Sequence, residues 1–184
     1  MATPGVIGPF PPYVADDDAA RDEFDRKRRR VLWTMPSGLY IIGSRHDGRR
    51  NGMVLNWATQ VAFQPKLIGI GVEKSALTHE LISASALFSL MTVARADRAI
   101  IRKFTKPVEV DETAMTLNGF PFHDGITGVP VLDQAPAVLE CEVRDTVDIG
   151  EHSFFIGETI DARFQLDEDT EVLRMEDTRL NYGG

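Results

Sequence analysis

A run of alternating residues between positions 51 and 65 constrains the fold more than any other part of the chain. It follows a polar turn at 45–50 and leads into a second apolar run at 67–72. Its large apolar residues would share one face: Met53, Leu55, Trp57, Val61 and Phe63. The other face is small or polar: Asn56, Ala58 and Gln60. A period of two predicts a β-strand over 53–63, and its small, polar face suits a flat ligand better than solvent.

Composition places the chain among globular proteins. With 184 residues, 43% of them hydrophobic and 26% charged, it has the make-up of one domain with a sizeable core. The net charge of -8 argues against nonspecific nucleic-acid binding, which depends on Lys and Arg. No apolar run approaches the roughly 20 residues of a membrane helix, and the N-terminus lacks a signal-peptide pattern. Cys141 is the single cysteine, so an internal disulfide is excluded and the cytoplasm is the default location.

Strand signals dominate the remaining sequence. Further strands are expected at 31–34, 39–44, 67–72, 87–93, 137–145 and 152–164, and helices at 22–30, 77–84 and 95–104. The basic run in the first helix is interpreted as a solvated face. Turn formers over 105–133 predict a long excursion with short strands, and an extended, poorly ordered arm is expected over 1–20. Because few helices separate the strands, a barrel of mainly antiparallel strands is favoured over a doubly wound parallel sheet.

Taken singly, most candidate sites have an ordinary structural interpretation. Gly69 and Gly71 lack the third glycine of a dinucleotide fingerprint, so close backbone packing explains them better. Lys74, Ser75 and Thr78 stand where a strand passes into a helix. Ser75 is expected to cap that helix, although the group would also suit a phosphate.

The same holds for three other residues. Residues alone favour a core role for Trp57 and a structural role for His152, although a histidine at the start of a strand could reach a ligand. Cys141 lies between two glutamates, which would raise the pKa of its thiol, and we interpret it as structural. None of the 4 histidines has zinc-site spacing, so no metal is expected.

Five segments, taken in order, resemble the flavin reductase-like family. This family of FMN-binding split-barrel proteins includes flavoredoxins and the small reductase components of two-component monooxygenases. The segments are Met35-Pro36-Ser37-Gly38, Asn51 through Trp57 to Pro65, Lys74-Ser75 with Thr78, Leu139-Glu140-Cys141, and Gly150 to Glu158. The resemblance spans about 31–182. It implies an N-terminal extension over 1–30 and an FMN-binding domain over 31–184.

The resemblance implies a mainly β split barrel with a few helices, a homodimer, and one FMN per subunit near the dimer interface, with FAD possible and NAD(P)H as co-substrate. It also implies a cofactor-binding set: Asn51, Gly52, Met53, Asn56, Trp57, Ala58, Thr59, Gln60, Lys74, Ser75, Thr78, Lys103 (or Arg102) and Tyr182. Lys74, Ser75 and Thr78 would hold the phosphate. His152 is the implied catalytic residue, facing the ring where nicotinamide docks. Two departures from the family are Glu151, in place of the usual aspartate, and a short ending after Tyr182.

Three functions agree with these residues. The first is an NAD(P)H-dependent flavin (FMN) reductase, which passes hydride to the flavin. The second is an electron-transfer flavoprotein reduced by a protein partner, and the third a flavin-binding protein without turnover. All three share the flavin pocket, so the choice between NADH and NADPH, the use of flavin as prosthetic group or substrate, and the identity of any monooxygenase or electron-transfer partner stay open. No nucleic-acid or membrane partner is expected.

Overall fold

A computed structural model describes residues 9–178 and divides the chain into two compact units, which meet in sequence between Pro36 and Ser37. The first unit contains α1 (Asp18–Leu32), where the Asp17 side chain accepts a hydrogen bond from Ala20 N and caps the helix. The helix predicted over 22–30 is therefore confirmed and longer, and the strand predicted at 31–34 is wrong because the helix runs through Leu32. None of the residues of α1, all of which are described, is buried.

The arm before α1 is not extended over its described part. Phe10 packs edge-on against Phe24 with ring centroids 6.1 Å apart. The Arg28 guanidinium lies over both rings, 5.2 and 5.4 Å from their centroids. Cation–π and ring contacts thus fold residues 9–17 back along the helix.

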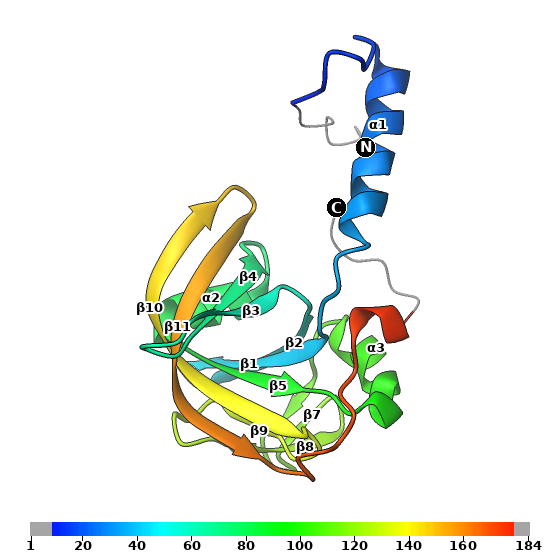
Figure 1. Ribbon diagram of the computed structural model, residues 1–184. Helices are drawn as coiled ribbons and strands as arrows, with labels where there is room; N and C mark the ends of the chain where they lie inside the picture. Colours follow the sequence, from blue (N-terminus) through cyan, green and yellow to red (C-terminus); the bar gives the residue numbers. More distant parts are fainter. Residues whose placement is uncertain (1–8, 179–184) are drawn as a thin grey trace. The chain divides into compact units, whose positions relative to one another are not determined.

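The second unit, Ser37–Thr178, is built on a seven-stranded antiparallel sheet in the order β2-β1-β5-β10-β11-β4-β3 (Figure 1). Its strands are β1 (Tyr40–His46), β2 (Arg49–Leu55), β3 (Ala58–Ala62), β4 (Leu67–Glu73), β5 (Leu87–Thr92), β10 (Ala137–Ile149) and β11 (His152–Phe164). Two register shifts in the β10–β11 ladder bend this long hairpin (Figure 1), and at its tip β11 still pairs with β4, starting with His152 opposite Glu73.

The strand predicted over 53–63 is in fact two strands at opposite edges of the sheet. Leu55 ends β2 at one edge, and Ala58 begins β3 at the other. Three Cα–Cα steps keep these two residues within roughly 11 Å of each other. The two edges are therefore held together at this point, which curls the sheet round its core as the predicted barrel requires. The predicted inward face fails after the break, because Trp57, Val61 and Phe63 are exposed.

The other elements cover the two hydrophobic clusters of the barrel. Their bounds are α2 (Leu77–Ser85), η1 (Arg95–Ile100), α3 (Ile101–Phe104), β6 (Val110–Asp111), β7 (Thr116–Leu117), β8 (Phe120–Asp124), β9 (Pro130–Leu132) and η2 (Met175–Asp177). β6 to β9 form a small second sheet, which is the predicted excursion with short strands. Phe104 and Phe122 bury one cluster, and Ile82 of α2 helps bury the other. Within residues 9–178, no helix is long and apolar enough to cross a membrane.

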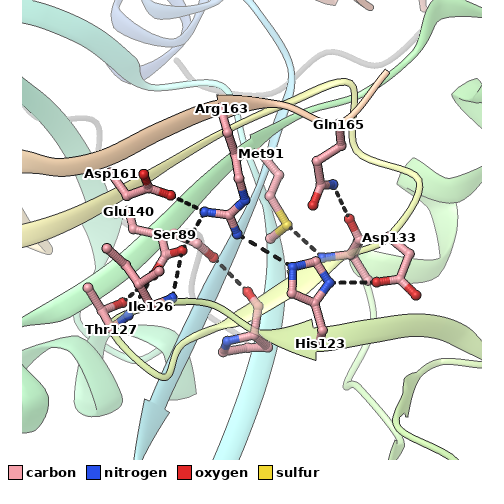
Figure 2. Close-up of polar contacts among 12 residues, drawn as sticks. Ser89, Met91, His123, Ile126, Thr127, Asp133, Glu140, Asp161, Arg163 and Gln165 are labelled. Carbon is pink, nitrogen blue, oxygen red and sulfur yellow. Dashed lines mark hydrogen bonds and ion pairs between the residues drawn. The ribbon is translucent and has the colours of Figure 1, made fainter. Parts of the chain in front are cut away.

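A buried carboxylate ties β10 to the loop that follows β8. The Glu140 side chain is fully buried and accepts hydrogen bonds from Ile126 N and from Thr127 N and Oγ1 at 2.6–3.1 Å (Figure 2). Arg163 Nη1 donates a further bond at 2.7 Å and also pairs with Asp161. Burial by itself would raise the pKa of Glu140, but these hydrogen bonds outweigh it and lower the pKa below its ordinary value.

Replacing Glu140 with Ala should therefore lower the free energy of unfolding by about 3–5 kcal/mol, because a half-buried cation and several N–H donors lose their partner. Glu142→Ala on the same strand is the matched control and should cost less than about 1 kcal/mol, since that side chain is 44% exposed. Urea denaturation measures both.

The same experiment has a pH dependence of known sign. The folded-state pKa of Glu140 lies below its ordinary value of 4.5, so its stabilisation is complete above that pH and is lost as the pH falls through the folded pKa. The difference between wild type and Glu140→Gln should therefore shrink in acid. Equal stability of Glu140→Ala and wild type at pH 7 would contradict this account.

Candidate functional site

The pairing of β11 with β4 brings three distant segments together. His152 lies opposite Glu73 in this ladder, and the next amide, Lys74 N, donates to Glu151 O at 2.9 Å. On the other side of β4, Gly71 N donates to Trp57 O at 2.9 Å. The start of β11, the β4–α2 connection and the β2–β3 junction therefore meet at one end of the sheet.

Two rings form the exposed part of this meeting point. Trp57 and His152 lie with ring centroids 4.9 Å apart and planes inclined at 57°. Trp57 is 40% exposed, so its predicted place in the core is wrong. A Cβ on Gly71 would lie 3.3 Å from the indole ring, so the absence of a side chain here lets the ring pack closely against the backbone of β4. His152 is half-buried at the start of its strand, which leaves the ring in reach of a ligand.

A buried hydrogen bond joins α2 to β2 behind these rings. Asn51 Nδ2 donates to Thr78 Oγ1 at 2.8 Å, and both side chains are buried. The hydroxyl of Thr78 has no exposed surface. Its side chain therefore holds Asn51, and its hydroxyl does not face a ligand at the start of α2.

Asn56, between β2 and β3, has an unsatisfied polar atom. The residue is 6% exposed, and its Oδ1 has no hydrogen-bond partner among the described residues. Leaving such an atom unpaired costs about 1–3 kcal/mol, and a native structure repays that cost through a ligand, a water or function. β3 follows directly as an edge strand, with Thr59 and Gln60 exposed. A flat ring with N–H and C=O groups matches both the unpaired oxygen of Asn56 and the exposed edge of β3.

Lys74 and Ser75 line an open cavity of about 670 Å³ at the start of α2. Lys74 Nζ contacts Asp148 Oδ1 at 2.7 Å, and this hydrogen bond and charge lower the pKa of the aspartate. Ser75 Oγ donates to Glu73 Oε1 at 2.7 Å. The helix begins after Ala76, which makes no side-chain capping bond, so the prediction that Ser75 caps it is wrong.

The remaining predicted residues lie beside the site or contribute to the packing around it. Lys103 is exposed on α3 beside buried Phe104, whose ring lies 2.7 Å from where a Cβ on Gly52 would be. This contact sets the end of α3 against β2, next to Asn51. Two members of the predicted set, Met53 and Ala58, pack partly buried against the core. Tyr182 lies outside the described residues.

Sequence reasoning missed two residues that border the site. His79 lies on α2 in the wall of the cavity, and Asp148 lies near the end of β10 and contacts Lys74. Cys141 is fully buried, and burial, more than the charge of Glu140, raises the pKa of its thiol to about 12, which agrees with a structural role. No group of three or more possible metal ligands occurs in residues 9–178.

The sequence matches the family model described as the flavin reductase like domain over residues 32–183. It is 33% identical over 158 residues to a ferric-chelate reductase (NAD(P)H) of Archaeoglobus fulgidus, a match covering 84% of this chain and 90% of that protein. A high molecular weight rubredoxin of Moorella thermoacetica is 36% identical over 137 residues, or 72% of this chain. The match spans 58% of the length of that rubredoxin.

Solved structures give the same result. The NADH:FAD oxidoreductase SgcE6 of Streptomyces globisporus, in complex with NAD and FAD fragments, superposes with a TM-score of 0.70 at 26% identity, covering 84% of this chain and 88% of that one. The chain belongs to the flavin reductase-like family, as its sequence predicted, and the mainly β antiparallel fold is confirmed. The names of these relatives also support a flavin-reducing oxidoreductase.

Proposed function

We propose that this protein is an NAD(P)H-dependent flavin reductase that binds FMN where β3, β11 and the β4–α2 connection meet. The observation that carries the proposal is the exposed Trp57–His152 ring pair beside the cavity lined by Lys74 and Ser75. The first feature suits a flat ring and the second suits an anionic group. The names of two relatives also support it, because one is a ferric-chelate reductase that uses NAD(P)H and the other is an NADH:FAD oxidoreductase.

Each feature has a role in binding. Asn56, Trp57, Thr59 and Gln60 would contact the isoalloxazine ring, and the unpaired Oδ1 of Asn56 is satisfied once a ring N–H reaches it. Lys74, Ser75 and the first backbone N–H groups of α2 would hold the phosphate, since a helix N-terminus and an ammonium both favour an anion.

The protein needs no acid or base of its own for the main step. When bound, the flavin supplies the reactivity that accepts hydride from nicotinamide. The task of the chain is to hold two flat rings in contact and to keep water from them. His152 is half-buried against Trp57, which supports a role for its ring in holding the nicotinamide or the flavin edge.

Lys74→Ala should weaken FMN binding at least tenfold and leave riboflavin binding unchanged, because a charge-assisted hydrogen bond to phosphate contributes about 1.5–3 kcal/mol. Titration of each ligand by flavin fluorescence measures the two dissociation constants. Lys66→Ala removes another exposed ammonium, in the β3–β4 turn, and should change neither. An equal loss of FMN and riboflavin in Lys74→Ala would sink the phosphate assignment.

His152→Ala should slow reduction of bound flavin by NAD(P)H ten- to a hundredfold, or about 1.4–2.7 kcal/mol, with little change in FMN occupancy. The bond it removes matters chiefly when the two rings are stacked for reaction. Anaerobic stopped-flow absorbance gives the rate, and His46→Ala, an exposed histidine at the end of β1, is the control. Loss of FMN with normal reduction of the remaining holoprotein would make His152 structural.

The same anaerobic experiment tests the function itself. NADH or NADPH, added to the protein with FMN, should bleach the flavin band. Binding of FMN without bleaching by either nucleotide would favour the electron-transfer alternative, in which a protein partner supplies the electrons. Failure to bind any flavin would remove the proposal altogether.

We also propose a homodimer, supported by the free edge of β10. β5 pairs with Val138–Glu142 only, and no described strand pairs with β10 on that side beyond Glu142. Val147 and Ile149 are exposed on this outer segment, so a second copy would cover an open edge that otherwise invites association. Light scattering at micromolar concentration should give twice the mass of one chain, and a monomer would contradict the proposal.

A cytoplasmic location, proposed from the single cysteine, is testable by cell fractionation.

A further inference from the structure

His79 lies in the wall of the cavity at the start of α2, one residue after Thr78. Its ring is half-buried, with its centroid 5.2 Å from that of buried Phe155. Ser83, one turn further along α2, lines the same cavity. The ring is thus held on one side by the core, and its other side belongs to the cavity that Lys74 and Ser75 open.

The hydrogen bonds of the ring favour one tautomer over the other. Nε2 lies 2.8 Å from Ser153 Oγ. Ser153 is buried and, within residues 9–178, its hydroxyl has no other hydrogen-bond partner, so this hydroxyl donates to Nε2 and satisfies both groups. The proton of the neutral ring is then on Nδ1. Its nearest acceptor is Ser83 Oγ, at a long 3.4 Å.

The ring is neutral at pH 7 because burial, and then the charge of Lys74, lower its pKa. A neutral imidazole has one N–H to donate, and here that group is only weakly engaged and borders the cavity. Glu80, the acidic residue in the cavity wall, is paired with Arg49 at 2.6 Å, so its charge is largely offset. The cavity wall thus holds the Lys74 ammonium, which pairs with Asp148, the Ser75 hydroxyl, which donates to Glu73, and the Nδ1–H of His79, and an anionic group would compete with the two carboxylates for the first two.

We propose that His79 is a specificity-determining residue, whose Nδ1–H donates a hydrogen bond to the phosphate of the bound flavin while Ser153 holds the ring in the required tautomer. The inference rests on the proposed function, because it takes the flavin phosphate to lie at Lys74 and Ser75. It assigns this chain a second donor, beside the lysine, that separates FMN from riboflavin.

The test uses two amides that reproduce one ring nitrogen each. The side-chain nitrogen of Asn falls near the position of Nδ1, and that of Gln falls near Nε2. FMN and riboflavin dissociation constants are measured by fluorescence titration for wild type, His79→Asn, His79→Gln and His79→Phe. Phe keeps a ring against Phe155 but has no N–H. The readout is the ratio of the riboflavin to the FMN dissociation constant, which a purely structural change would leave unaltered.

We expect His79→Phe and His79→Gln to lower this ratio roughly tenfold, the size of one charge-assisted hydrogen bond, and His79→Asn to stay near wild type. Recovery by Gln with loss in Asn, or equal weakening of both ligands in every variant, would make His79 a structural partner of Ser153 and overturn the inference. If His79→Phe fails to fold, the comparison of Asn with Gln decides alone.

Failure of the proposed function has a different signature. If wild type binds FMN and riboflavin equally, or if Lys74→Ala leaves their ratio unchanged, the phosphate does not lie in this cavity, and both the binding site given in the proposed function and the role of His79 are wrong. If the Lys74 effect is present and the His79 effect is not, only the role of His79 is wrong.

Discussion

The antiparallel register of β11 against β4 is the constraint on which the rest of the site depends. Seven residue pairs run from His152 opposite Glu73 to Glu158 opposite Leu67. A shift of one residue would turn His152 and Ser153 to the opposite faces of the sheet. Glycines help to fix this register, because a Cβ on Gly69 would lie 2.1 Å from the ring of Phe154, and one on Gly71 would meet Trp57. The rejected dinucleotide motif is therefore a packing device, as its position inside a strand predicted.

Sequence periodicity identified most strands because each keeps one face in the core. It could not show where the chain stops pairing with β1, at the end of β2, and starts pairing with β4, at the start of β3. The alternation runs unbroken through Leu55, Asn56 and Trp57, although the strand does not. An apolar pattern reports a side chain's preference for burial, and the exposure of Trp57 is set by strand pairing far away in sequence. The same limit explains residues 31–34, where a short apolar run ends a helix whose capping signal lies at Asp17, outside the window that suggested a strand.

The residues of the candidate site were found by their order along the chain, while the orientation of their side chains was not. Thr78 follows Lys74 and Ser75 on the same connection, yet the helix turns its hydroxyl inward onto Asn51 and turns His79 toward the cavity. Helical rotation decides this, and it depends on where the helix starts. Because α2 begins after Ala76 rather than after Ser75, side chains near its start are turned differently from what the expected cap implies. Asp148 was missed because its contact with Lys74 spans 74 residues of sequence.

The contact between Lys74 and Asp148 means that an anion arriving in the cavity finds no bare ammonium there. It meets an ammonium that already donates to a carboxylate near the tip of the β10–β11 hairpin, and it either shares the three N–H donors of Lys74 with that carboxylate or displaces it. Occupancy therefore depends on a competition between two anions for one ammonium, and one of these anions is supplied by the protein itself. Whenever the incoming group wins, the Asp148 side chain loses its ion pair with Lys74, while Lys74 N still donates to Glu151 O and β11 still pairs with β4, so the filled and empty states differ in one side-chain contact at the end of β10.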